Sequence, residues 1–216
     1  MVKAKKQPDT IYREMMNNEA LYRLGSADKL MKNSNNFQDR VQVDSAILQM
    51  RKAMEAIAFS SIAPSEKRYE DLHRHKEKKI GDHYHAKKIM TSLAAINPDF
   101  YPIPLVPAIR QLDRSWHFGR KTTGYMTRKC FENLYDRLGK YLHTINPWGN
   151  DPQLHQLCNE LPAAIDAVYE LLDVHLAVLH IEEPSATQVW VVDAKRDGTV
   201  AMVIAMADGP CVIQPA

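Results

Sequence analysis

The stretch Met126–Trp148 reads MTRKCFENLYDRLGKYLHTINPW, and its pattern predicts one amphipathic helix around which the chain is organised. Apolar residues recur at spacings of three and four, which is typical of a single buried helix face. These residues are Phe131, Leu134, Leu138, Leu142 and Ile145. Thr127 is the expected N-cap, because its hydroxyl can accept a hydrogen bond from amides of the first turn. Asn146 precedes Pro147 and is therefore steered out of the α region, so we expect the helix to end there.

Upstream of this stretch the sequence predicts further helices. Phe37–Ile62 has apolar residues at steps of four and three, and Pro64 ends it. The apolar positions are Val43, Ile47, Met50, Met54 and Ile57. Thr10–Leu24 has a similar stripe that Gly25–Ser26 interrupts, and Lys87–Ile96 is a shorter helix. The first half of the chain is therefore expected to be mainly helical.

Strand signals occur between and after the helices. Phe100–Pro107 contains three prolines and must be extended, and Trp116–Arg120 is a candidate short strand. A helix is expected from Asp151-Pro152, with a kink or a break at Pro162. Three β-compatible runs follow it, and the Asp-Gly pair in Arg196-Asp197-Gly198 is a strong hairpin turn signal. The runs are Leu176–Ile181, Gln188–Asp193 and Thr199–Met206.

We therefore predict a mainly α single domain over residues 1–216. A disordered start at 1–8 precedes a helical bundle over about 10–174. A small C-terminal antiparallel β hairpin or meander over about 176–207 completes the domain. The composition, 45% hydrophobic and 25% charged, is that of an ordinary globular protein, and 216 residues suffice for one substantial core.

Composition and motifs exclude several classes of protein. A formal net charge of +2 is too small to indicate a nucleic-acid binder by itself. Three cysteines without a CxxC pair indicate neither a disulfide framework nor a structural zinc site. No apolar run approaches 18 residues and the start lacks a signal peptide, so we expect no membrane span and a reducing, cytoplasmic setting. Neither a P-loop nor a GxGxxG motif is present, so no cofactor is expected.

Four histidines lie in a strongly charged segment, Glu66–His85. They are His73, His75, His83 and His85. Two His-x-His pairs allow a metal-site interpretation, since neutral imidazole is a common zinc ligand. The segment lacks an HExxH pattern and is too charged for a strand, so we favour a solvated charged face or loop and no metal. Its many lysines and arginines are a third alternative, a positive patch for phosphates.

Arg137 and His143 share the polar side of the central predicted helix. His143 is six positions after Arg137, and on an ideal helix this step places their Cα atoms about 120° apart around the axis and about 9 Å apart along it. Arginine matches phosphate with a planar fork of donors, and histidine can carry a proton near neutral pH. Together they could promote attack of a ribose 2′-hydroxyl on its own phosphodiester. The alternative is structural: Arg137 pairs with a carboxylate, and His143 caps the helix C-terminus.

The motif YDRLGKYLHTINPW resembles the signature region of HEPN (higher eukaryote and prokaryote nucleotide-binding) proteins, in which Arg, four to six residues and His lie near the end of a helix. The helix RKAMEAIAF at Arg51–Phe59 is similar to a core helix of that family. The resemblance implies an all-helical bundle and a metal-independent endoribonuclease, usually a homodimer whose facing helices assemble one composite site. His143 would act as general base or acid, and Arg137 would stabilise the phosphorane.

The same resemblance implies a toxin or phage-defence role, with RNA as substrate and an antitoxin protein as a further partner. One departure from the family is Leu138, because active members commonly have a polar residue directly after the arginine. The competing hypothesis is a non-catalytic helical interaction or scaffold protein. Under it, this helix face binds a partner chain.

Other side chains have two interpretations each. Lys140 and Tyr141 are candidate RNA contacts or ordinary surface residues, and Asn146 binds either the substrate or the helix end. Asp136 is expected to be a surface carboxylate rather than a partner of His143. The tryptophans could stack on bases, but packing in the core or at an interface is the favoured role for Trp116, Trp148 and Trp190. His175 is expected to form structural hydrogen bonds at a helix-to-strand junction.

Overall fold

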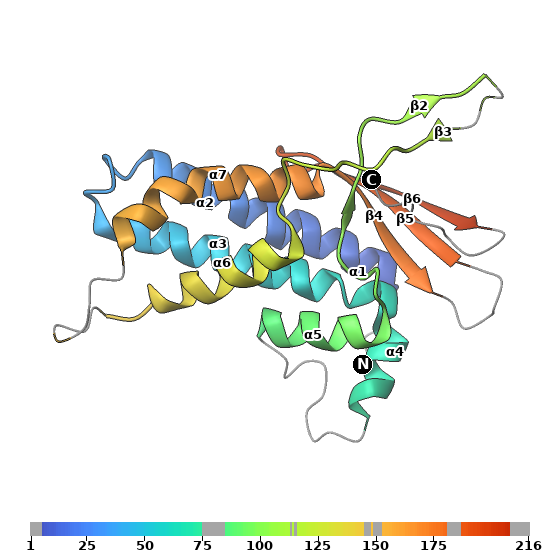
Figure 1. Cartoon of the computed structure of the whole chain (residues 1–216), viewed down its shortest axis with the longest axis horizontal. Helices are drawn as coiled ribbons and strands as arrows, with labels where there is room; N and C mark the ends of the chain where they lie inside the picture. Colours follow the sequence, from blue (N-terminus) through green and yellow to red (C-terminus); the bar gives the residue numbers. More distant parts are fainter. Residues whose placement is uncertain are drawn as a thin grey trace.

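The computed structural model describes residues 6–74, 85–112, 114, 116–144, 148, 153–180 and 187–207. The described chain is mainly helical and carries a small antiparallel sheet. The long helices run along the long axis of the molecule, and the sheet lies at one end of it (Figure 1). The predicted fold class is confirmed at this level: mainly α with a small C-terminal sheet.

The N-terminal helices form one continuous helical run. α1 (Pro8–Met15) passes through a π-helical segment, η1 (Met16–Leu21), into α2 (Tyr22–Lys32). The prediction that Gly25–Ser26 interrupts this helix is wrong. Leu24 beside the glycine is fully buried, and packing of that face outweighs the cost of about 1 kcal/mol for a helical glycine.

The two ends of this run follow local rules. Pro8 begins α1, as its fixed φ allows at a first helical position, so the helix starts inside the segment predicted to be disordered. The first five residues lie outside the described chain. After α2 the chain turns with positive φ angles at Asn35, Asn36 and Phe37, and asparagine tolerates this region best among non-glycine residues.

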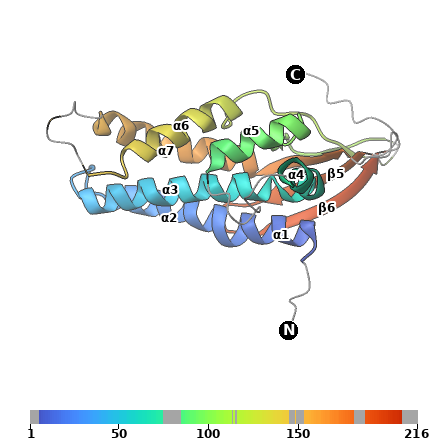
Figure 2. The same ribbon diagram turned by 90° about the horizontal axis from the view of Figure 1, so that it is seen from below.

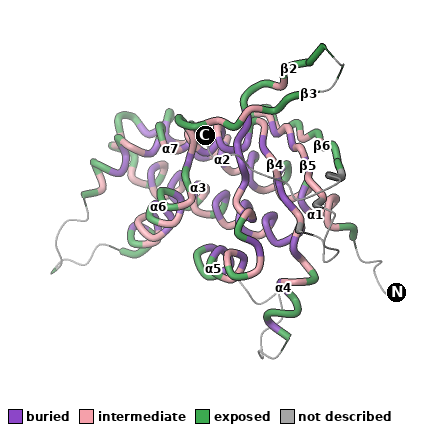
Figure 3. Tube along the Cα trace, turned by 45° about the vertical axis from the view of Figure 1, so that its right-hand side comes forward, coloured by how far each residue is buried: buried purple, intermediate pink, exposed green. Residues whose placement is uncertain are grey.

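α3 (Arg40–Ser60) lies at the centre of the helical part, in contact with η1, α2, α5 and α6. The Asp39 carboxylate accepts a hydrogen bond from the Gln42 amide at 3.1 Å and caps the helix. Buried positions recur along the whole helix (Figure 3), as the apolar spacing predicts. The predicted core helix is confirmed.

A short 3₁₀ turn, η2 (Ala63–Ser65), leads into α4 (Glu66–His73), and α5 (Ala86–Ile96) follows beyond the next gap in the described chain. Of the two forms expected for that charged segment, a solvated charged face or a loop, its first part takes the form of a helix with a charged outer face. It forms α4, because Tyr69 on it is fully buried and anchors the helix to the body.

α6 (Arg128–Lys140) and α7 (Leu154–Leu172) complete the helical part. Pro162 lies inside α7, which continues through it as one helix rather than as two segments. The predicted start at Asp151-Pro152 lies outside the described residues. Seen at right angles, α6 lies on the side of α3 opposite to α1 (Figure 2), and α7 contacts α2.

The sheet is antiparallel throughout, with strand order β1-β4-β5-β6. Its strands are β1 (Ile103–Pro104), β4 (Val174–His180), β5 (Thr187–Ala194) and β6 (Val200–Ala207). β4, β5 and β6 form the predicted meander, and β1 from the proline-rich extended segment adds an edge that the sequence did not indicate. Gly198 turns the last hairpin with φ +94°, as an Asp-Gly turn requires.

A second, two-stranded ribbon projects from the body beside the sheet (Figure 1). Its strands are β2 (Ile109–Arg110) and β3 (Trp116–His117), paired antiparallel. The candidate strand at Trp116–Arg120 is confirmed in its first part. Trp116 is 59% exposed, so it lies outside the core of this chain, and packing at an interface stays a prediction.

One face of the sheet packs on the N-terminal helices. The Tyr12 hydroxyl donates to His175 Nε2 at 2.7 Å, and His175 Nδ1–H donates to the Leu172 carbonyl at 2.8 Å. Trp190 meets the Tyr12 ring edge-on at 5.6 Å and is buried. The predicted structural role of His175 is confirmed, and so is core packing for Trp190. A hydrophobic core cluster therefore joins helices and sheet.

Candidate functional site

The candidate site lies at the C-terminal end of α6, where the helix boundary differs from the prediction. The Thr127 hydroxyl accepts from the Cys130 amide at 3.3 Å, so the predicted N-cap is confirmed. The helix ends at Lys140 rather than at Asn146, which lies outside the described residues. Gly139 weakens the last turn, and the Tyr141 amide closes it by donating to the Leu138 carbonyl at 3.2 Å.

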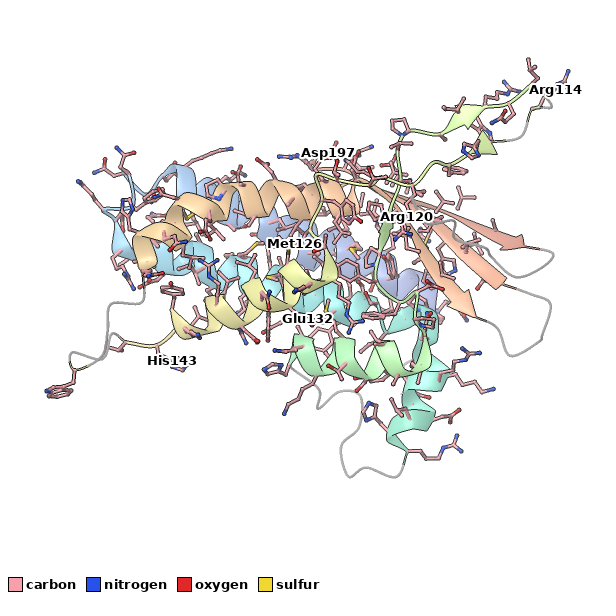
Figure 4. All side chains as sticks on the ribbon, in the orientation of Figure 1. Arg114, Arg120, Met126, Glu132, His143 and Asp197 are labelled. Carbon is pink, nitrogen blue, oxygen red and sulfur yellow. The ribbon has the colours of Figure 1, made fainter. Side chains whose placement is uncertain are left out.

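This boundary separates the two candidate catalytic residues. Arg137 occupies the last turn of α6, whereas His143 lies three residues beyond the helix end and is exposed. Figure 4 shows His143 at the end of the molecule away from the sheet. The helical geometry expected for the pair, with its fixed rotation and rise, therefore does not apply.

Arg137 is held by an acidic residue of its own chain. Its Nη1 donates to Glu160 Oε2 on α7 at 2.7 Å, and both side chains are about two-fifths exposed. Gln156 donates to the other oxygen of this carboxylate at 2.8 Å. The hydrogen bond from Arg137, followed by that from Gln156, lowers the pKa of Glu160 below its ordinary value. The pair orients the guanidinium, and it uses one of the five N–H donors that arginine carries.

The other predicted site residues take different positions. Lys140 is exposed at the end of α6 and remains available to a ligand. Tyr141 is only 7% exposed and belongs to the hydrophobic core, so its ring packs inside the protein rather than on the surface. Asp136 is a surface carboxylate as predicted, and it accepts from Lys87 at 2.5 Å. Trp148 is 92% exposed, so it lies outside the core of this chain.

A cation–π contact that the sequence did not indicate joins α3 to α6. The Arg51 guanidinium lies 3.8 Å from the centre of the Tyr135 ring and donates to the Tyr135 carbonyl at 2.8 Å. Glu55 accepts from the Tyr135 hydroxyl at 2.8 Å, and burial followed by this carboxylate raises the pKa of Tyr135 to about 12. A Cβ added at Gly139 would lie 2.8 Å from Arg51 Nη1. The glycine therefore makes room for the arginine.

The histidines of the charged segment do not gather within the described residues. His73 is buried and its ring lies tilted against the Tyr69 ring with ring centres 4.7 Å apart, and His85 meets the Tyr135 ring at 5.4 Å. His75 and His83 lie outside the described chain. Among the residues that the structure describes, no group of three or more His, Cys, Asp or Glu side chains could hold a metal ion.

A separate cavity of about 450 Å³ lies at the sheet end of the molecule. Leu179, Trp190 and Ile204 give it an apolar wall, and Ser65 and Arg68 are among its polar lining residues. Its lining does not include Arg137 or His143, so it is a different feature from the candidate site.

Comparisons with protein-family models, with curated proteins and with solved structures gave no match for this chain. Within the described residues, no helix has both the length and the apolar character needed to cross a bilayer. Functional inference therefore rests on the residues and their geometry.

Proposed function

We propose that this protein is an RNA-binding protein of HEPN-like character that cuts RNA without a metal ion through Arg137 and His143. The observation that carries the proposal is the Arg-x5-His motif at the end of α6, with both side chains accessible to solvent. The proposal treats α2, α3, α6 and α7 as a helical bundle of the HEPN kind. A toxin or phage-defence role, and an antitoxin partner, belong to the same proposal.

The chemistry needs two groups. His143 removes the proton of a ribose 2′-hydroxyl, whose oxygen attacks the adjacent phosphorus. The bond to the 5′-oxygen breaks and that oxygen takes up the proton that His143 removed, which leaves a 2′,3′-cyclic phosphate and a 5′-hydroxyl end. Arg137 donates to the phosphorane oxygens while Glu160 holds its guanidinium in place. Because His143 lies beyond the helix end, its approach to Arg137 depends on the path of the chain after Lys140.

A second candidate is a non-catalytic interaction protein, and the Arg137–Glu160 ion pair is the observation that favours it. An arginine that already has a carboxylate partner in its own chain has a structural role without any substrate. Under this hypothesis the exposed residues around the end of α6 bind a partner chain.

An RNA cleavage assay in excess EDTA distinguishes the ribonuclease from the non-catalytic interaction protein. The parent protein is expected to produce 2′,3′-cyclic phosphate ends, and His143→Ala and Arg137→Ala each to lower the rate by about 100-fold or more. His155→Ala is the matched control, because His155 is also an exposed histidine near this end and lies on α7. It should cleave at the parent rate.

Glu160→Gln tests the orienting carboxylate. In the enzyme it should lower cleavage less than Arg137→Ala does, since the guanidinium remains but is held less firmly. Cleavage that survives His143→Ala would show that His143 has no catalytic part. A folded parent protein without any cleavage would support the interaction protein instead.

A further inference from the structure

The last strand, β6, is an open edge of the sheet (Figure 1). It pairs with β5 over eight residues and has no strand neighbour on its other side among the described residues. The opposite edge is β1, which spans two residues and contains Pro104. Proline and short length are devices by which proteins protect a sheet edge. β1 therefore has such protection, whereas β6 has neither device within the part of the chain that the structure describes.

The hairpin turn fixes which backbone groups of β6 point outward. Lys195 N–H donates to the Thr199 carbonyl at 2.8 Å, so these two residues form a hydrogen-bonded pair. Along an antiparallel ladder, hydrogen-bonded pairs alternate with non-hydrogen-bonded pairs. Counting from Thr199, the non-hydrogen-bonded positions of β6 are therefore Val200, Met202 and Ile204. Their N–H and C=O groups point away from β5. The Ala194 amide, opposite Val200, agrees with this alternation because it donates away from β6, to the Asp173 carbonyl.

The side chains of β6 do not protect this edge either. The strand reads VAMVIAMA and contains no charge, proline or glycine. Val203 is 66% exposed and Ile204 is 46% exposed, and these neighbours point to opposite faces of the sheet. An uncharged apolar edge with outward backbone donors and acceptors is a template for another strand.

We propose that β6 pairs antiparallel with β6 of a second copy of this chain, so that four strands from each copy form one continuous sheet. Antiparallel pairing about a two-fold axis brings the same residues of both copies together, which gives the isologous contact that most homodimers use. Two-fold symmetry places identical residues near one another, which would bring like charges together in a charged strand. Because β6 carries no charge, its self-pairing has no such repulsion. A second copy therefore fits this edge without a complementary sequence elsewhere.

This arrangement differs from a dimer of facing α6 helices. The end of α6 and the sheet lie at opposite ends of the molecule (Figure 4). A dimer through β6 leaves the surroundings of Arg137 and His143 outside the interface, so each copy would carry its own site. The inference stands independently of the RNA chemistry proposed above.

Sedimentation velocity over a concentration series of the full chain tests the pairing. The parent should dimerise reversibly. Ile204→Pro removes an outward N–H while the β5–β6 ladder keeps its hydrogen bonds, and it should weaken dimerisation by at least about tenfold, because each copy loses an intermolecular hydrogen bond. Ile204→Ala shortens the same side chain but keeps the N–H, and it should dimerise more tightly than Ile204→Pro.

A second pair of variants tests the proposal if Ile204→Pro does not fold. Val203→Lys places a charge in the middle of the pairing strand and should also yield monomer, whereas Val41→Lys changes a 75% exposed valine on α3 and should not. Leu142→Lys, just beyond α6, probes the alternative dimer. A parent that is monomeric at every concentration overturns the proposal. So does a dimer that persists in Ile204→Pro and Val203→Lys, and its loss in Leu142→Lys would assign the interface to α6.

Discussion

The buried His175 should make the stability of this protein depend on pH. His175 is fully buried between the Tyr12 hydroxyl and the Leu172 carbonyl. Burial lowers its pKa from an ordinary value of 6.5 to about 4, and the hydrogen bond to Leu172 opposes this shift only in part. The folded protein therefore holds the imidazole neutral over a range in which the unfolded chain protonates it.

The direction and the size of this pH effect on stability follow from proton linkage. Between pH 6.5 and about 4 the unfolded state binds more protons at this residue, so stability falls as the pH is lowered through that window. At about 1.4 kcal/mol for each pKa unit, the full loss is about 3 kcal/mol, and about 2 kcal/mol of it is reached by about pH 5. Above pH 6.5 and below about pH 4, the contribution of His175 to the free energy of unfolding changes little with pH.

Urea unfolding followed by far-ultraviolet circular dichroism measures the effect. The free energy of unfolding is determined at several pH values for the parent and for His175→Gln, which keeps hydrogen-bonding groups but cannot titrate. The variant should be less stable near neutral pH, and its deficit should shrink by about 2 kcal/mol by about pH 5. His143→Gln, an exposed histidine, is the control. If parent and His175→Gln lose stability in parallel, the reasoning about burial is wrong.

Two further predictions concern local packing and capping. Alanine has a higher helix propensity than glycine by about 1 kcal/mol, but Gly139→Ala alone should not stabilise the protein, because its Cβ would meet Arg51. In an Arg51→Ala background, where this contact is removed, Gly139→Ala should stabilise the protein by about 1 kcal/mol. Equal effects in both backgrounds, measured by urea unfolding, would contradict this coupling. Asp39→Ala should cost about 1 kcal/mol in thermal or urea unfolding, whereas Asp39→Asn should cost little, since its amide oxygen still accepts from the Gln42 amide. Equal losses in both variants would refute a capping role for Asp39.

Local sequence signals account for much of the fold. The apolar spacing within Phe37–Ile62 identifies α3, and the Asp197-Gly198 pair identifies the last hairpin, because both signals act over a few residues. Thr127 as an N-cap is a signal of the same kind. The break predicted at Gly25 failed because tertiary packing, which no local window contains, holds α2 together.

The candidate site was less accessible to prediction. Its residues were chosen by spacing on an assumed helix, and the helix ends at Lys140, so the spacing lost its geometric meaning. The partner of Arg137 is Glu160, 23 residues further along the chain, and the Arg51–Tyr135 contact spans 84 residues. Such contacts depend on how whole helices pack. Gly139 beside Lys140 was the one local sign that the helix could end early.

The bond between Tyr12 and His175 also has a kinetic consequence, because 163 residues separate its two partners. During synthesis α1 is complete long before the sheet on which it packs, and β1 must likewise wait for β4. Contacts between distant parts of a chain slow folding, since their loops must close before the contacts stabilise anything. In the nascent chain Tyr12 therefore lacks its partners His175 and Trp190 until β4 and β5 have left the ribosome.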